Sequence, residues 1–171
     1  MATDRSVRLG PMLHFRPLFP QDQSTLWDWL HIALWDPPPA PLRPREVLDN
    51  PGVRIYAEDW GRPTDIGLVA VQEGADAGAC WMRVLPEGVG LASVDASTPQ
   101  LGIGLWPAFQ RQGIGKALML AALDAAWRAG HAQVALTVHP ENPARRMYAA
   151  CGFEEAGLRG MYHLMVARRP A

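Results

Sequence analysis

Two glycines lie close together in residues 110–115, which read Gln-Arg-Gln-Gly-Ile-Gly and precede a long amphipathic segment. A glycine has no side chain that would keep a ligand away from the backbone. The first N–H groups of a helix have no acceptor inside the helix, and they attract phosphate and other anions. We therefore predict a strand over residues 101–106, an anion-binding turn, and a helix over residues 113–129.

Glycine turns occur in several phosphate-binding folds, so the surrounding sequence must distinguish between them. The stretch lacks the GxxxxGK[ST] pattern of a P-loop. It also follows several expected strands, whereas a Rossmann fingerprint normally opens the fold. A nucleotide-binding protein of either type stays open as an alternative, as does simple packing of the two glycines.

A second helix start follows a strand that we expect over residues 133–138. Asn142 offers a side-chain acceptor for the first N–H groups of the helix, and Pro143 suits the first helical position. Gly152 is typical of the end of such a helix. The second half of the chain thus contains two helix starts, each close behind a strand.

The first half of the chain must supply most of the sheet that positions these helices. Residues 36–41 are rich in proline and form an extended connector or, alternatively, a docking site for a proline-binding module. One or two helical turns are expected over residues 45–49. A helix over residues 21–35 would carry Leu26, Trp27, Leu30, Ala33 and Leu34 on its apolar face, with Trp29 to the side. Apolar and β-branched patterns predict further strands over residues 13–18, 53–58, 66–72, 78–85, 153–156 and 161–167.

Composition excludes several classes of protein. The chain has 171 residues, which fits one domain, and its 49% hydrophobic and 19% charged residues are typical of a soluble globular protein. A net charge of −1 gives no general attraction to nucleic acid or to an anionic membrane. Since no segment resembles a signal peptide or a membrane span, we expect a cytoplasmic protein without nucleic-acid or membrane partners.

Residues 1–10 are expected to form a flexible tail, followed by a single domain over residues 11–171. Cys80 and Cys151 have no CxxC partner and lie in apolar surroundings, so we expect buried free thiols.

The two motifs together resemble the GNAT superfamily of acyl-CoA-dependent N-acyltransferases. Residues 110–115 match the family signature (Q/R)-x-x-G-x-(G/A), and its second conserved block is matched by Asn142, Ala144, Tyr148, Gly152 and Phe153. The resemblance covers roughly residues 11–167 and is most specific over residues 100–153. It implies an α/β fold with a mixed, mostly antiparallel seven-stranded sheet flanked by helices and splayed between strands 4 and 5.

The resemblance also implies a reaction. Acetyl-CoA would be the co-substrate, and an amine would attack its thioester directly, without a metal. Tyr148 would be the general acid that protonates the leaving thiolate, since a phenol can do so only from close by. The residues implied to hold the cofactor are Leu105, Trp106, Arg111, Gln112, Gly113, Ile114, Gly115, Lys116 and Asn142. For Asn142, capping of the helix and contact with the pantetheine arm can coexist.

The general base is the least defined part of this site. Many relatives have a glutamate where this chain has Gln100, and an amide cannot accept the proton. His139 is the best titratable candidate by position, followed by Glu58 and Asp59. A water chain, or an amine that arrives neutral, would need no base at all.

The acceptor is expected to be the primary amine of a small molecule or a peptide. Trp27, Trp60 and Trp81 are candidates to wall its site, either for an apolar or aromatic acceptor or for a cation held over an indole ring. Core packing is the alternative role for each. A non-catalytic acyl-CoA-binding sensor of the same fold is the alternative function, and the protein is expected to be a monomer or a homodimer.

Overall fold

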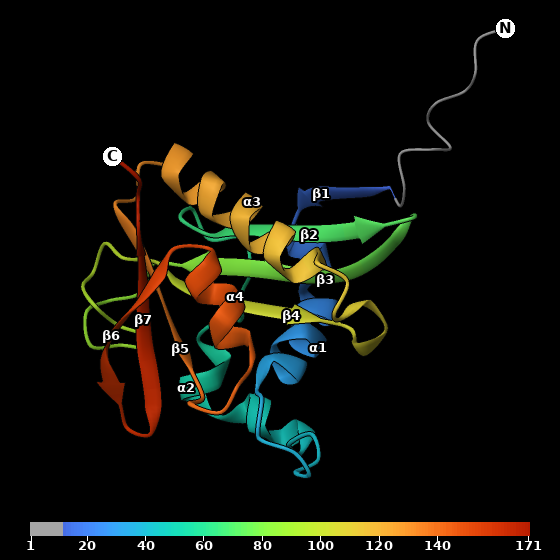
Figure 1. Ribbon diagram of the computed structural model, residues 1–171, viewed down its shortest axis with the longest axis horizontal. Helices are drawn as coiled ribbons and strands as arrows, with labels where there is room; N and C mark the ends of the chain where they lie inside the picture. Colours follow the sequence, from blue (N-terminus) through green and yellow to red (C-terminus); the bar gives the residue numbers. More distant parts are fainter. Residues whose placement is uncertain (1–11) are drawn as a thin grey trace, which may run out of the picture.

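The structure, a computed structural model, describes residues 12–171 and is built on one sheet (Figure 1). Its strands are β1 (Leu13–Pro17), β2 (Ile66–Gln72), β3 (Ala75–Arg83), β4 (Gln100–Leu105), β5 (Gln133–Val138), β6 (Phe153–Arg159) and β7 (Tyr162–Arg168). They lie in the order β1-β2-β3-β4-β5-β7-β6, and only the β4–β5 pair is parallel. The predicted mixed, mostly antiparallel seven-stranded sheet is confirmed, whereas the predicted tail over residues 1–10 lies outside the described residues.

Helices cover both faces of this sheet. On one face lie α3 (Ile114–Arg128) and α4 (Ala144–Ala150), and on the other lie α1 (Gln23–Ala33) and α2 (Pro51–Arg54) (Figure 1). Short 3₁₀ turns are η2 (Pro20–Asp22), η3 (Arg45–Asp49) and η4 (Pro107–Phe109). Because strand side chains alternate between faces, Cys80 joins the core under α3, while its neighbour Ala79 joins the core under α1. No helix in residues 12–171 is long and apolar enough to span a membrane.

The prediction of a strand over residues 53–58 is wrong, because α2 and a series of turns occupy this stretch. Its backbone carbonyls accept hydrogen bonds from side chains of β3 rather than from a neighbouring strand. Arg83 donates to the carbonyls of Ile55 (3.0 Å) and Glu58 (2.7 Å). Trp81 Nε1 donates to the carbonyl of Tyr56 at 3.1 Å. These tertiary contacts override the β propensity of the sequence.

The apolar face of α1 also differs from the prediction, because Trp29 rather than Trp27 lies in the core. The helix approaches β4 so closely that a Cβ atom on Gly104 would lie 2.5 Å from the carbonyl oxygen of Trp29. This approach rotates Trp29 onto the sheet, where its ring lies 6.2 Å from that of Trp106. Trp27 instead packs under the guanidinium of Arg54, 4.8 Å from the ring centre.

Several boundaries move by a few residues. β6 runs longer than predicted, β7 is shifted by one residue, and the two strands are joined at Gly160, whose φ of +60° suits a tight turn. β3 already begins at Ala75, and β4 already includes Gln100. Cys80 and Cys151 are both free thiols, as expected, but only Cys80 is buried, whereas Cys151 is half-buried.

Candidate active site

The sheet opens between β4 and β5. Their pairing is restricted to one position, Gln100 opposite Ala135, although β4 pairs with β3 along its whole length. Trp106 N–H donates to the carbonyl of Ala77 at 2.9 Å, and backbone groups alternate in direction along an antiparallel ladder. The backbone groups of Ile103 and Leu105 therefore point away from β3, into the opening. The predicted splay between strands 4 and 5 is present.

This alternation changes the expected roles of two cofactor-binding candidates. Leu105 can offer its N–H to a ligand in the opening, and its carbonyl accepts from Gln110 Nε2 at 3.0 Å. Trp106 cannot offer its N–H, because that group is already bonded to β3. Ile103, which sequence reasoning missed, offers the second cleft-facing N–H. Its position two residues before Leu105 is the signal that could have identified it.

The turn before α3 presents a row of unused backbone donors. From Arg111 to Lys116, no backbone N–H donates to any residue in the described part of the chain. Arg111 and Gly113 adopt positive φ values of +61° and +80°, which turn the backbone into the helix start. Ile114 is buried and anchors this turn, while Gln112 Nε2 donates to the carbonyl of Ala108 at 2.9 Å. The arrangement can bind a phosphate group through the backbone.

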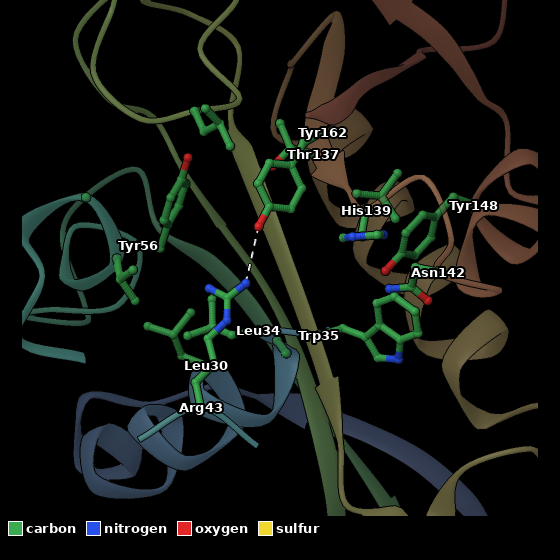
Figure 2. Close-up of a pocket in the computed structure, with 15 residues that line it drawn as sticks. Leu30, Leu34, Trp35, Arg43, Tyr56, Thr137, His139, Asn142, Tyr148 and Tyr162 are labelled. Atoms are coloured by element: carbon green, nitrogen blue, oxygen red, sulfur yellow. Dashed lines mark hydrogen bonds between the residues drawn. The ribbon is translucent and has the colours of Figure 1, made fainter. Parts of the chain in front are cut away.

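A cavity of about 280 Å³ lies where β5 ends and faces α1, α2 and the loop over residues 34–44 (Figure 2). A second cavity of about 130 Å³ lies between β4 and β5 and shares wall residues with the first, Tyr56, Thr137 and Tyr148 among them. The polar and aromatic side chains of the larger cavity are Trp35, Arg43, Tyr56, Thr137, His139, Asn142, Tyr148 and Tyr162. The opening between the strands thus leads into a chamber that can hold a second reactant.

Tyr148 lies at the junction of the two cavities. Its ring is buried in the core and contacts Phe153 edge to face, with 6.1 Å between the ring centres. Its hydroxyl makes no hydrogen bond to residues 12–171 and points toward the space beside His139 and Asn142 (Figure 2). Burial raises the pKa of Tyr148 well above its usual value. The phenol therefore keeps its proton and is positioned to donate it.

His139 lines the cavity between Trp35 and Tyr162, with ring centres 5.4 Å and 6.1 Å away. The backbone N–H of Glu141 donates to His139 Nδ1 at 3.0 Å. This hydrogen bond occupies the Nδ1 lone pair, so the neutral ring carries its proton on Nε2. The hydrogen bonding thus favours a donor role for His139 over the predicted role as base.

Asn142 caps a helix and also lines the larger cavity. Its Oδ1 accepts from the N–H of Ala144 at 2.9 Å and caps α4, which confirms the predicted capping. The residue also lines the larger cavity, where its Nδ2 can donate to a ligand. Glu58 and Asp59, the other base candidates, do not line either cavity. They lie instead near the exposed guanidinium of Arg62.

Gln100 is buried and has both ends of its amide satisfied. Oε1 accepts from the hydroxyl of Tyr56 at 2.7 Å, and Nε2 donates to the carbonyl of Val89 at 2.8 Å. A Cβ atom on Gly90 would lie 2.3 Å from Gln100 Oε1, so only glycine fits beside it. Gln100 therefore joins the loop after β3 to the cavity wall and carries no proton-transfer function.

Replacing Gln100 with Glu is expected to destabilise the protein by roughly 1–3 kcal/mol at neutral pH, because a buried carboxylate cannot donate to Val89. A buried Glu has a raised pKa, so the deficit grows as the pH rises above about 4.3. Urea unfolding at pH 5 and pH 8 measures this loss in the free energy of unfolding. Gln112→Glu is the matched control, since it loses a similar bond to a carbonyl on an exposed site. Equal losses in both variants would contradict the buried role.

The three tryptophans predicted to wall an acceptor site lie in different places. Trp81 lines the smaller cavity. Trp27 and Trp60 line neither cavity, which corrects their prediction. Trp60 is buried on the α1 face because its Nε1 donates to the carbonyl of Leu18 at 2.9 Å. The aromatic walls come instead from Trp35, another tryptophan that the sequence suggests for this role, and from Tyr56 and Tyr162, which no local signal in the sequence marks.

These features define an α/β fold whose sheet opens between two parallel strands, beside backbone N–H groups that can bind a phosphate. The chain belongs to the acetyltransferase (GNAT) family, since the sequence model of that family matches residues 26–153. A mycothiol acetyltransferase of Nocardiopsis dassonvillei is 33% identical over 97 residues, which is 56% of this chain. The match spans 29% of that protein's length.

Solved structures share the fold at low sequence identity. The PaiA N-acetyltransferase of Thermoplasma acidophilum, in complex with coenzyme A, has a TM-score of 0.66 and 16% identity over 92% of this chain and 99% of that one. The ribosomal-protein-S18-alanine N-acetyltransferase of Escherichia coli has a TM-score of 0.64 and 20% identity over 92% and 94%. The aminoglycoside acetyltransferase AAC(6')-Ib, in complex with coenzyme A and kanamycin, has a TM-score of 0.62 and 20% identity over 92% and 95%. These likenesses establish the fold.

Proposed function

We propose that the chain transfers an acetyl group from acetyl-CoA to the primary amine of a small molecule or peptide. The observation that carries this proposal is the parting of β4 and β5 beside the unused N–H groups at residues 111–116. Relatives of the same fold are solved in complex with coenzyme A. A co-substrate with a pyrophosphate and an extended, amide-containing arm fits both features.

In this proposal the backbone N–H groups from Arg111 to Lys116 hold the pyrophosphate. The exposed side chains of Arg111 and Lys116 add positive charge. The pantetheine arm runs beside β4, where Ile103 and Leu105 offer backbone groups in the manner of a neighbouring strand. Asn142 Nδ2 contacts the same arm. These contacts direct the thioester toward the junction of the two cavities, next to Tyr148.

The chemical step is a direct attack. The amine nitrogen forms a bond to the thioester carbon, and the bond from that carbon to sulfur breaks. The N–H of Leu105 stabilises the negative charge that develops on the carbonyl oxygen. Tyr148 gives its proton to the leaving thiolate, and the proton released by the amine passes to water. Proximity of the two bound reactants supplies much of the acceleration.

The pH dependence of the reaction is expected to follow the acceptor rather than the protein. Among the described residues, no Asp or Glu lines either of these two cavities, so no carboxylate of the protein can take the proton of the amine. The amine must therefore lose its proton in solution before it attacks. Below the pKa of the acceptor amine, kcat/KM should rise about tenfold per pH unit and then level off. Tyr148 stays protonated throughout, because burial raises its pKa, so no alkaline decline is expected below about pH 10.

The measurement compares the pH profiles of kcat/KM for two acceptors whose amine pKa values differ by about two units. Their kcat/KM profiles should be displaced along the pH axis by that difference. A common inflection for both acceptors would instead reveal a titrating base in the protein.

Thermal shift measurements distinguish the proposal from a nucleotide-binding function. Acetyl-CoA at about 100 times its Kd should stabilise the protein by about 2.7 kcal/mol, whereas ATP and NAD should leave the melting temperature unchanged. Stabilisation by ATP or NAD but not by acetyl-CoA would contradict the proposal. Binding of acetyl-CoA without acetyl transfer to any amine would identify a sensor of the same fold.

A further inference from the structure

Arg43 is held rigidly at the wall of the larger cavity. Its Nε and Nη2 donate to the two carboxylate oxygens of Asp36, at 2.7 Å and 2.8 Å. Nη2 also donates to the hydroxyl of Tyr162 at 3.2 Å, and His31 Nε2 lies 2.6 Å from the Arg43 carbonyl oxygen. Prolines stiffen the loop that carries both members of the ion pair. The guanidinium therefore has little freedom to reorient.

One nitrogen of this guanidinium, Nη1, is free to bind a ligand. Arginine has five N–H donors in one plane, and Asp36 and Tyr162 use three of them. The two donors on Nη1 make no hydrogen bond to residues 12–171. Figure 2 shows the Arg43 guanidinium between Tyr56 and Tyr162, among the side chains that line the cavity. These two donors belong to one nitrogen and diverge, so Nη1 can donate to one oxygen of a carboxylate, and the positive charge of the guanidinium attracts the anion.

The charges around the cavity favour an anion over a second cation. Of its described lining residues, Arg43 carries the permanent positive charge, and none is Asp or Glu. The nearby carboxylate of Asp36 is already bound by Arg43 and does not line the cavity. An acceptor with several ammonium groups would find no carboxylate partner here and would be repelled by the guanidinium.

The size and polarity of the larger cavity narrow the class of acceptor further. The cavity volume of about 280 Å³ lies just below the roughly 300–1,000 Å³ typical of ligand pockets, which suits one small molecule. Leu30, Leu34 and Val53 give it an apolar wall beside the polar groups. An apolar side chain on the acceptor would fit there.

We propose that the acceptor is an amino acid, or a close relative that bears a carboxylate near its amine, with an apolar or aromatic side chain, and that Arg43 binds the carboxylate. This inference rests on the proposed acetyl transfer and names its substrate class. The ion pair with Asp36 orients the guanidinium, and the free Nη1 donates to one carboxylate oxygen of the acceptor. Tyr148, at the opposite end of the cavity, marks where the amine reacts.

The test measures acetyl-CoA-dependent thiol release by the full chain. The acceptors are the twenty standard L-amino acids, the carboxamide of each, spermidine and kanamycin, with rates corrected to equal concentrations of neutral amine. The best amino acid should have a kcat/KM about 10- to 100-fold above that of its carboxamide, as a hydrogen bond between charged groups provides. Spermidine and kanamycin should be poorer acceptors than this amino acid.

Arg43→Gln should abolish the preference by raising the KM of the amino acid, so that the ratio of kcat/KM between the amino acid and its carboxamide falls to about one. Arg45→Gln is the matched control, because it makes the same charge change on an exposed residue that pairs with Asp28 outside the cavity. Tyr162→Phe removes one contact of the guanidinium but keeps its charge, so it should raise the KM of the amino acid by a smaller factor. Circular dichroism checks the fold of each variant.

Three results would overturn the inference while leaving the proposed function intact. These are a carboxamide preferred over its amino acid, spermidine or kanamycin as the best acceptor, and an Arg43→Gln variant that loses activity equally with both forms. Acetyl-CoA binding without acetylation of any amino acid would overturn it as well. Failure of the proposed function gives a different result, since no acceptor of any class would then release thiol from acetyl-CoA, whether or not acetyl-CoA binds.

Discussion

Tyr148→Phe is expected to lower kcat at least tenfold, and by as much as the 10²- to 10⁴-fold that general acid catalysis contributes. The hydroxyl makes no hydrogen bond to the described residues, and phenylalanine keeps the edge-to-face contact with Phe153. Folding stability and the Kd for acetyl-CoA should therefore change little. Steady-state kinetics at saturating acetyl-CoA, with the Kd measured by calorimetry, separate the two effects.

Tyr162→Phe is the natural comparison, since it removes another tyrosine hydroxyl from the same cavity. That hydroxyl accepts from Arg43 and lies away from the proposed thiolate. Its loss should act on the KM of the acceptor more than on kcat. If kcat of the Tyr148→Phe variant equals that of the unchanged protein, Tyr148 is not the acid.

Asp65→Asn is expected to destabilise the protein by about 3–5 kcal/mol, the cost of breaking a buried ion pair. Asp65 and Arg83 are both buried and form two hydrogen bonds, at 2.7 Å and 3.1 Å. Asp65 also accepts from the backbone N–H groups of Gly61 and Arg62, both at 3.0 Å. Without this carboxylate, the charge of Arg83 is left buried and unpaired.

The Asp65→Asn variant should also perturb the active site. Arg83 holds the carbonyls of Ile55 and Glu58, on either side of Tyr56 in the cavity wall. Urea unfolding monitored by tryptophan fluorescence measures the stability change. Asp124→Asn is the matched control, since it breaks an exposed pair with Arg128 on α3, worth about 0.5 kcal/mol. Similar losses in the two variants would show that burial of the Asp65–Arg83 pair does not matter.

The two helix starts were predictable because their signals are local. Gly113 adopts a φ of +80° directly before α3, a conformation that glycine favours. Asn142 caps α4 through the N–H two residues later. Each signal depends on a few neighbouring residues, so the sequence contains the necessary information. The apolar and β-branched patterns that predicted β2, β5 and β7 are equally local.

The chamber beyond the opening was not predictable in this way, because distant segments build it. Trp35 and Arg43 lie on either side of the proline-rich segment over residues 36–41, for which the sequence predicts only a connector or a docking site. Tyr56 comes from the stretch predicted as a strand, and Trp81 and Arg83, at the end of β3, hold that stretch in place. Contacts between residues so far apart in sequence leave no local pattern.

Gln100 illustrates a second limit. Its residue type excluded proton transfer, but its structural role could not be read from the sequence. The pairing with Tyr56 and Val89 brings together a turn, a loop and a strand. Burial and partners decide whether such an amide is a lost base or a structural link, and both are properties of the fold.

Release of free thiol from acetyl-CoA in the presence of amine acceptors tests the proposed N-acetyl transfer most directly. Thiol release should require both reactants, match the amount of N-acetylated product by mass spectrometry, and fall at least tenfold in the Tyr148→Phe variant. Acetyl-CoA that binds but yields no acetylated amine with any acceptor would contradict a catalytic role for the cleft between β4 and β5.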